Sequence, residues 1–185
     1  MQHHGAPTRL LDWTLSPYVA AYFAARQDGA NRPGAVWCFC AKTLQQSFEA
    51  NHKPLSAFEE TRAVKWYTSN LKKLRKEALV VPLDFNYSSS ERMAAQQGRF
   101  TMCFKLQQKH DCIIGQIGQD YLKKLLIPHE SKPDFLLRLR DMNITASALF
   151  PGVDGLGHSV RELVSLGVHY KTVARAEASR PLKRS

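Results

Sequence analysis

The sequence predicts an α+β fold, in which a small mixed or antiparallel sheet surrounds one buried helix and further helices lie at the periphery. An apolar run from Tyr18 to Ala25 follows a Ser-Pro pair and supplies the central helix. Short apolar stretches supply strands at residues 35–40, 78–85, 99–104 and 121–128. A chain of 185 residues is long enough to bury a core, and we expect one domain over residues 1–170.

The central helix is expected to begin at Pro17. The Ser16 hydroxyl can accept a hydrogen bond from a free N–H of the first turn, and Pro17 then occupies the position where its missing donor costs nothing. The run that follows is apolar on every side, so we expect this helix to lie in the core.

Strands and helices are expected to alternate through the middle of the chain. Residues 35–40 are dense in apolar side chains, which predicts a strand that is buried on both faces. Pro82 has no N–H to donate, so strand 78–85 should lie near a sheet edge or at a strand end. Helices are expected at residues 41–50, 56–76 and 91–96.

A helix-turn-strand unit is expected around Gln96. Serines in the polar loop before residue 91 can cap the helix over residues 91–96, and Gly98 should stop it. Residues 99–104 then alternate with a period of two, which is typical of a strand.

The C-terminal third is expected to be mostly helical. Residues 105–119 are predicted to form a loop before the strand at residues 121–128. A helix over residues 134–142 should end at Asn143 in the left-handed conformation, and a last amphipathic helix should cover residues 159–166. Basic residues predict a flexible tail over residues 171–185.

Composition narrows the classes of function. Lys and Arg number 26 against 16 Asp and Glu, but the basic runs lack interleaved aromatic residues, so nucleic-acid binding is not favoured. Neither a membrane span nor a signal peptide is present in the sequence, which predicts a cytoplasmic protein without a membrane partner. The Cys and His residues have no metal-ligand spacing, so no metal site is expected.

The N-terminal loop has the highest density of candidate functional residues in the sequence. Arg9 and Asp12 lie near the start of the buried helix, where an unpaired charge is costly, so each needs a partner. One alternative is an Arg9–Asp12 pair that pins the loop, with His4 as a structural histidine. In the other alternative, the Arg9 guanidinium binds a phosphate or carboxylate ligand through its forked N–H donors, and His4 is a polar contact beside it.

This loop resembles the signature of the FRG domain family. The signature covers Gln2-His3-His4-Gly5-Ala6-Pro7-Thr8-Arg9-Leu10-Leu11-Asp12-Trp13-Thr14. Two later segments are also similar to the family, namely Arg92-Met93-x-x-Gln96-x-Gly98-x-Phe100 and Leu149-Phe150-Pro151-x-x-Asp154-Gly155. The resemblance therefore spans residues 1–165. The family carries a Phe-Arg-Gly element upstream of the signature, and its absence from this sequence predicts an N-terminally truncated domain.

At the level of fold, the resemblance extends to ADP-ribosyltransferase-like proteins, which bind NAD in a cleft of a split β-structure. It implies NAD as a substrate and no permanently bound cofactor. Gln96 is the catalytic candidate, because a hydrogen bond to the ribose strengthens as positive charge develops there. In the implied cofactor site, Arg9 holds the pyrophosphate and Tyr22, with Trp13 in reserve, stacks on the nicotinamide. The implied cofactor-binding residues are His4, Thr8, Arg9, Asp12 and Tyr22.

Two facts weigh against catalysis. Glutamine cannot act as a general base, so the acceptor would need its own nucleophile or help from Glu91 or Asp84. Tyr22 also fits a plain core position. Three alternatives follow: an ADP-ribosyltransferase-like or NAD glycohydrolase-like enzyme, a non-catalytic module for a nucleotide-like molecule or a partner, and an inactive fragment. The pocket hypothesis predicts that Arg9, Tyr22 and Gln96 converge on one concave site.

Overall fold

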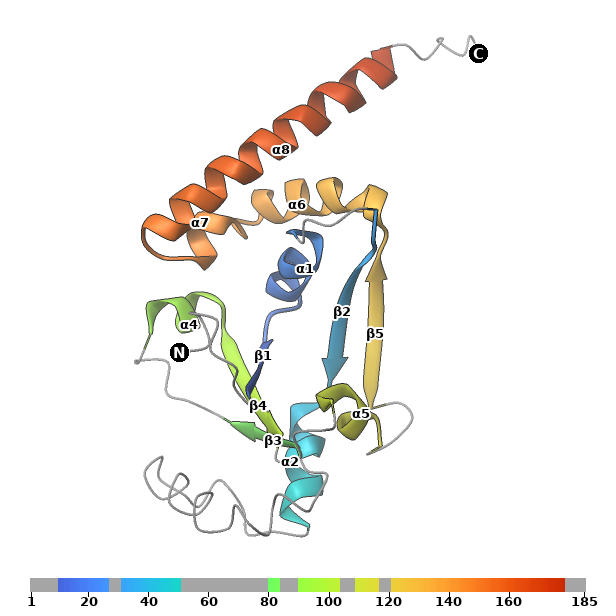
Figure 1. The fold of residues 1–185 in the computed structure, drawn as a ribbon, viewed down its shortest axis with the longest axis vertical. Coiled ribbons are helices and arrows are strands. Elements are labelled where there is room, and N and C mark those ends of the chain that lie inside the picture. Colours follow the sequence, from blue (N-terminus) through green and yellow to red (C-terminus); the bar gives the residue numbers. More distant parts are fainter. Residues whose placement is uncertain are drawn as a thin grey trace. The chain divides into compact units, whose positions relative to one another are not determined.

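The computed structural model describes residues 10–26, 31–50, 80–83, 90–103, 109–116 and 121–178, and it confirms the α+β class (Figure 1). The chain forms two compact units. Unit 1 comprises Met1–Leu15, Val36–Ser89 and Gln97–Leu125, and unit 2 comprises Ser16–Ala35, Ser90–Gln96 and Leu126–Ser185. The single domain expected over residues 1–170 and the flexible tail expected after it stay predictions. The helix expected over residues 56–76 lies outside the described residues.

Unit 1 contains a three-stranded antiparallel sheet. Its strand order is β1 (Leu10–Thr14), β4 (Gly98–Cys103) and β3 (Val80–Leu83). Pro82 lies opposite Thr101 on the edge strand β3, which confirms its expected position near an edge. Strand β1 was not expected from the sequence, because the turn residues before it favoured a loop. Its pairing partner, β4, comes from a distant part of the chain.

The core of unit 1 joins this sheet to two short helices. Buried Leu44 of α2 (Ala41–Glu49) packs with Cys103 and with Ile113 and Ile114 of α5 (His110–Gly115). Helix α2 confirms the helix expected at residues 41–50. Helix α5 corrects the loop expected over residues 105–119. The two adjacent isoleucines explain the difference, because their burial fixes one face of the helix in an otherwise polar segment.

Strands β2 (Gly34–Phe39) and β5 (Leu122–Ile127) pair in a separate two-stranded sheet. Both lie where the sequence predicted strands. The expectation that β2 is buried on both faces is wrong, since Cys38 is exposed and Trp37 keeps 38% of its surface accessible. A two-stranded sheet offers fewer neighbours than the interior of a parallel sheet. Within unit 1, the Trp37 ring is contacted by the Lys124 ammonium, whose Nζ lies 5.0 Å from the ring centroid.

Unit 2 is built around α1 (Pro17–Arg26), which begins where the sequence predicted. The Ser16 hydroxyl accepts a 3.3 Å hydrogen bond from the Val19 N–H, which is the expected N-cap. Val19 and Tyr22 are buried, whereas Tyr18 at the first turn is 55% exposed. The helix is therefore mostly in the core, as predicted, but one side of its first turn reaches solvent.

The other helices of unit 2 are α4 (Glu91–Ala95), α6 (Lys132–Asp141), α7 (Ala146–Leu149) and α8 (Val153–Ala178), with a 3₁₀ turn at His129–Ser131. Four residues of α6, α7 and the segment after α7 complete the buried core around Val19 and Tyr22, namely Leu139, Ala146, Leu149 and Phe150. Helix α6 occupies the predicted segment, and Asn143 after it adopts a φ of 60°, as expected.

Two helix ends differ from expectation. Ser90 holds the N-cap position of α4, but its side chain makes no cap hydrogen bond. At the other end, Gln97 and not Gly98 takes the left-handed conformation, with a φ of 48°, and Gly98 is the first residue of β4. The chain must reverse between α4 and β4, and the Gln97 carbonyl is held by a 3.1 Å hydrogen bond from the Leu15 N–H.

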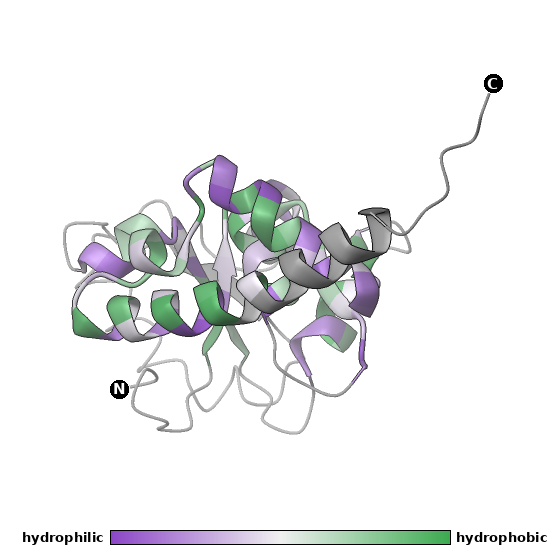
Figure 2. Ribbon diagram, turned by 90° about the horizontal axis from the view of Figure 1, so that it is seen from above, coloured by the Kyte–Doolittle hydropathy of each residue, from purple (hydrophilic) through white to green (hydrophobic). Residues whose placement is uncertain are grey.

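Helix α8 is much longer than the amphipathic helix expected over residues 159–166. It begins at Val153, immediately after Gly152 with its φ of 95°, and continues to Ala178. It therefore includes six residues before the expected start and twelve after the expected end. Figure 2 shows hydrophobic residues along the described part of this helix. Gly155 is buried, and a Cβ at that position would lie 1.9 Å from the Phe150 carbonyl oxygen. This glycine therefore lets α8 start against the chain that leads into it.

Candidate functional site

The predicted site residues fall into three groups. His4, Thr8 and Arg9 lie outside the described residues. Asp12 belongs to β1 of unit 1, where it is exposed and lies opposite Phe100. Tyr22 and Gln96 both belong to unit 2. The convergence of Arg9 with Tyr22 and Gln96 therefore stays a prediction.

Tyr22 is a core residue whose hydroxyl group has a hydrogen-bond partner. Its side chain has 0% exposure, and its hydroxyl donates a 2.8 Å hydrogen bond to Oε2 of Glu162 on α8. Its ring meets Phe23 edge-to-face with 5.7 Å between the ring centroids. Burial, followed by the bond to Glu162, raises the pKa of Tyr22. Tyr22 thus has no exposed ring face on which a ligand could stack.

Gln96 ties two helix ends together. Its Nε2 donates a 2.9 Å hydrogen bond to the Leu149 carbonyl oxygen at the end of α7. This bond satisfies one of the carbonyls that a helix end leaves without a partner. It also places the end of α4 beside Phe150, the residue that follows Leu149.

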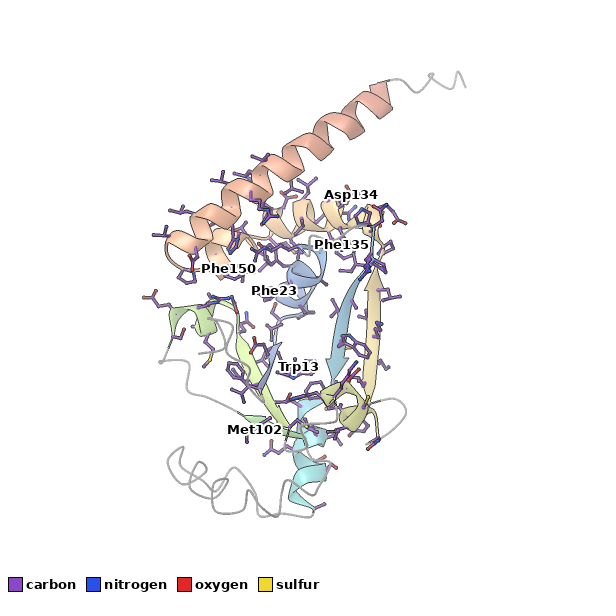
Figure 3. All side chains as sticks on the ribbon, viewed as in Figure 1. Trp13, Phe23, Met102, Asp134, Phe135 and Phe150 are labelled. Carbon is purple, nitrogen blue, oxygen red and sulfur yellow. The ribbon has the colours of Figure 1, made fainter. Side chains whose placement is uncertain are left out.

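Phe150 is surrounded by cationic and aromatic side chains, which together form the Phe150 cluster. The Arg26 guanidinium lies 4.8 Å from the Phe150 ring centroid, and the Arg92 guanidinium lies 4.7 Å from it. Phe23 meets the same ring edge-to-face at 5.8 Å, and the His158 ring lies at 5.2 Å. Figure 3 labels Phe23 and Phe150, which come from α1 and from the segment between α7 and α8. Four separate segments of unit 2 contribute to the cluster.

Two side-chain polar atoms of unit 2 are buried without a hydrogen-bond partner among the described residues. They are Nε of Arg92 and Oγ of Ser159, which follows His158 on α8. A buried donor without a partner is costly, and an isolated buried charge is more so. Arg26 and Arg92 both contact one ring, and no carboxylate of the described residues pairs with either. An anion would supply the missing acceptor and neutralise the two like charges.

The sequence carries only a partial signal for this cluster. Arg92 and Phe150 lie in the two later segments that resemble the FRG family, but the sequence predicts no role for either. Arg26 lies in the last turn of α1, where a basic residue is ordinary because it suits the helix dipole. Only the packing of α1, α4 and α8 on Phe150 shows that these cations belong together.

A second polar network lies in unit 1. It involves Trp13, the second candidate for stacking on the nicotinamide. The Trp13 indole N–H donates a 2.8 Å hydrogen bond to Oγ1 of Thr101, which lies 2.9 Å from Nδ1 of His110. The Trp13 ring meets Phe39 edge-to-face at 4.5 Å. Thr101 is buried, so this network fastens β1 to β4 and α5. Within the described residues, Trp13 is thus a structural anchor of unit 1.

Comparisons with known proteins support the family resemblance at the N-terminus. The described residues define an α+β protein with an arginine-flanked aromatic cluster as its candidate site. Residues 1–32 match the family model of the FRG domain, so the FRG resemblance is confirmed on the segment that carries its first signature. No curated protein and no solved structure matches the chain. For residues 33–165 the resemblance stays a prediction.

The described residues contain no group of three or more His, Cys, Asp or Glu side chains that could hold a metal ion. Their helices also include none with the length and apolar character that crossing a membrane requires.

Proposed function

We propose that this chain is a binding module for a phosphate-containing, nucleotide-like small molecule, and that Arg26 and Arg92 hold the phosphate. The observation that supports it is the pair of guanidiniums on one buried ring, together with the Arg92 Nε that has no partner among the described residues. Guanidinium groups bind phosphate through two parallel N–H donors, which a lysine cannot imitate. The cytoplasmic location expected from the sequence belongs to the same proposal.

The geometry favours this binding module over an ADP-ribosyltransferase-like enzyme. The catalytic candidate and the stacking candidate are both engaged in structural bonds, since the Gln96 amide holds Leu149 and Tyr22 is buried against Glu162. The Leu149 carbonyl that Gln96 contacts does not supply the general base that glutamine lacks. NAD is therefore a ligand to be tested here, and its cleavage is the outcome that would restore the enzyme alternative.

Calorimetric titration of the whole protein with ADP, NAD and inorganic phosphate tests the proposal. We expect ADP to bind and to raise the melting temperature, with an affinity that falls as salt is added. Replacing both arginines, Arg26→Gln with Arg92→Gln, should abolish binding. Arg138→Gln is the matched control, because Arg138 is an exposed arginine of α6 in the same unit.

Three outcomes would contradict the proposal. The first is that none of the three probes binds the unaltered protein, and the second is that the double variant binds as tightly as the control. The third is release of nicotinamide from NAD, detected by chromatography, which would identify an enzyme in place of a binding module.

A further inference from the structure

Two exposed thiols lie on one face at the end of β2. Cys38 belongs to this strand, Cys40 follows its last residue, and both are free cysteines. Side chains alternate across an extended backbone, so Cys38 and Cys40 share the face opposite to Phe39. Phe39 packs against the core of unit 1 and meets Trp13 edge-to-face at 4.5 Å, which turns the two thiols away from that core.

We propose that Cys40 is a peroxide-reactive thiol and that Cys38 converts its oxidised form into a reversible disulfide. Both residues belong to unit 1, whereas the Phe150 cluster belongs to unit 2, so this site does not depend on the proposed phosphate site. Cysteines that react with peroxides are solvent-accessible and commonly lie next to a second, resolving cysteine. The end of β2 meets both conditions.

The start of α2 activates Cys40. The Cys40 carbonyl accepts a 3.2 Å hydrogen bond from the Leu44 N–H, so Cys40 is the N-cap residue of this helix. Its sulfur accepts hydrogen bonds from the Thr43 hydroxyl and from the Thr43 N–H, and these bonds, the hydroxyl first, lower the pKa of the Cys40 thiol. The thiolate is the form that attacks peroxides, and the positive end of a helix favours it.

The reaction has two steps. The Cys40 thiolate attacks one oxygen of hydrogen peroxide, the O–O bond breaks, and the hydroxide that leaves takes up the thiol proton to give water and a Cys40 sulfenic acid. The Cys38 sulfur then attacks the Cys40 sulfur, the S–O bond breaks, and the departing hydroxide takes the Cys38 proton. In total, two thiols and one peroxide give one disulfide and two waters.

The spacing of the two cysteines makes this disulfide easy to reduce. Residues two apart in a strand have Cα atoms about 6.6 Å apart, close to the upper limit of about 6.8 Å for a disulfide, and their Cβ atoms must approach to about 4 Å. Closing the bond therefore requires the backbone to move, and Cys40, which lies beyond the last residue of β2, is the end that can move. A disulfide closed under strain has a more oxidising reduction potential, so a dithiol reopens it.

Peroxide treatment of the reduced whole protein, followed by alkylation of the remaining thiols and peptide mass spectrometry, tests the proposal. We expect the peptide that holds Cys38 and Cys40 to lose two hydrogens and to regain them with dithiothreitol. Cys112, an exposed thiol of α5, should stay reduced under the same treatment. Cys112→Ser is therefore the matched control, and it should form the disulfide as the unaltered protein does.

Single variants separate the two roles. Cys38→Ser should accumulate the Cys40 sulfenic acid, which dimedone traps, because the resolving thiol is gone. Cys40→Ser should leave Cys38 reduced, and serine is itself a good N-cap, so α2 keeps its start. Thr43→Val keeps both thiols but removes the hydroxyl donor, so it should slow the formation of the disulfide. This variant also replaces Cys40→Ser if circular dichroism shows that the serine protein unfolds.

Four results would overturn the proposal. The first is that peroxide forms no disulfide between Cys38 and Cys40, and the second is that Cys112 is oxidised as fast as Cys40. The third is dimedone labelling of Cys38 in Cys40→Ser at the rate at which Cys40 is labelled in Cys38→Ser, because Cys40 would then have no special reactivity. The fourth is a disulfide that links two chains, seen as doubled mass without reductant, which would exclude Cys38 as the resolving thiol.

Discussion

The Tyr22 hydroxyl donates a 2.8 Å hydrogen bond to Oε2 of Glu162, which joins α1 to α8 across 140 positions of sequence. Both partners come from the core side of their helices. Removing the donor would leave a carboxylate without its partner in a partly buried site, and such a loss is more costly than the net value of the bond itself.

Tyr22→Phe is therefore expected to lower the free energy of unfolding by about 1–3 kcal/mol. Chemical denaturation followed by circular dichroism measures this change. Tyr18→Phe is the matched control, because Tyr18 lies on the same helix and is 55% exposed, and it should have little effect. Equal stabilities of the two variants would show that the Tyr22–Glu162 bond contributes nothing net.

Alkaline pH should destabilise the protein through the same residue. The pKa of Tyr22 is raised above its ordinary value of 10.0, first by burial and then by Glu162. The folded state therefore keeps its proton at pH values where the unfolded chain has lost it. Stability is fully present below pH 10 and falls as the pH rises above it. The melting temperature of the unaltered protein should fall more steeply than that of Tyr22→Phe over this interval.

Gln96→Ala should destabilise unit 2 by about 1 kcal/mol, because the Leu149 carbonyl loses its hydrogen bond from Gln96 Nε2. Urea denaturation measures the loss. Gln116→Ala is a suitable control, since Gln116 is exposed at the end of α5. If Gln96→Ala is as stable as the control, the bond to Leu149 does not hold the two helix ends together.

Gly155→Ala should cost about 3 kcal/mol, because the added Cβ would lie 1.9 Å from the Phe150 carbonyl oxygen and the backbone must move. Gly115→Ala has open space around its Cβ and serves as the control. The displacement would reach Phe150, so the variant should also weaken ADP binding under the proposed function. Thermal denaturation and titration measure the two effects separately, and an unchanged melting temperature would contradict the steric argument.

Arg92→Lys separates charge from geometry at the Phe150 cluster. Lysine keeps the positive charge but loses the planar fork and the Nε donor, so ADP affinity should fall roughly tenfold, or about 1.4 kcal/mol. Calorimetry measures the dissociation constant. Unchanged affinity would mean that Arg92 acts only as a distant charge.

Local chemistry made some of the fold predictable. The start of α1 follows from Ser16 and Pro17, which act on the first helical turn alone, and the φ of Asn143 follows from its place after a helix. Pro82 correctly predicted that β3 lies at a sheet edge, because a proline has no N–H to donate within a central strand. In each case the controlling residue lies within or directly beside the element it controls.

Long-range contacts explain what could not be predicted. Strand β1 depends on pairing with β4 and on the Trp13–Thr101 bond, whose partners are 88 positions apart. The Phe150 cluster joins residues from position 23 to position 158, and a single sequence has no signal for that meeting. From the sequence alone, Tyr22 fits either a core position or a ligand contact. Its burial against Glu162 fits the first alternative.

The segment that matches the FRG family is divided between the two units. The boundary between Leu15 and Ser16 assigns β1 to unit 1 and α1 to unit 2. Strand β1 needs β4 for its hydrogen bonds, and α1 needs α6 for its packing. We therefore expect that residues 1–32, transplanted onto another protein, would carry the family signature without folding.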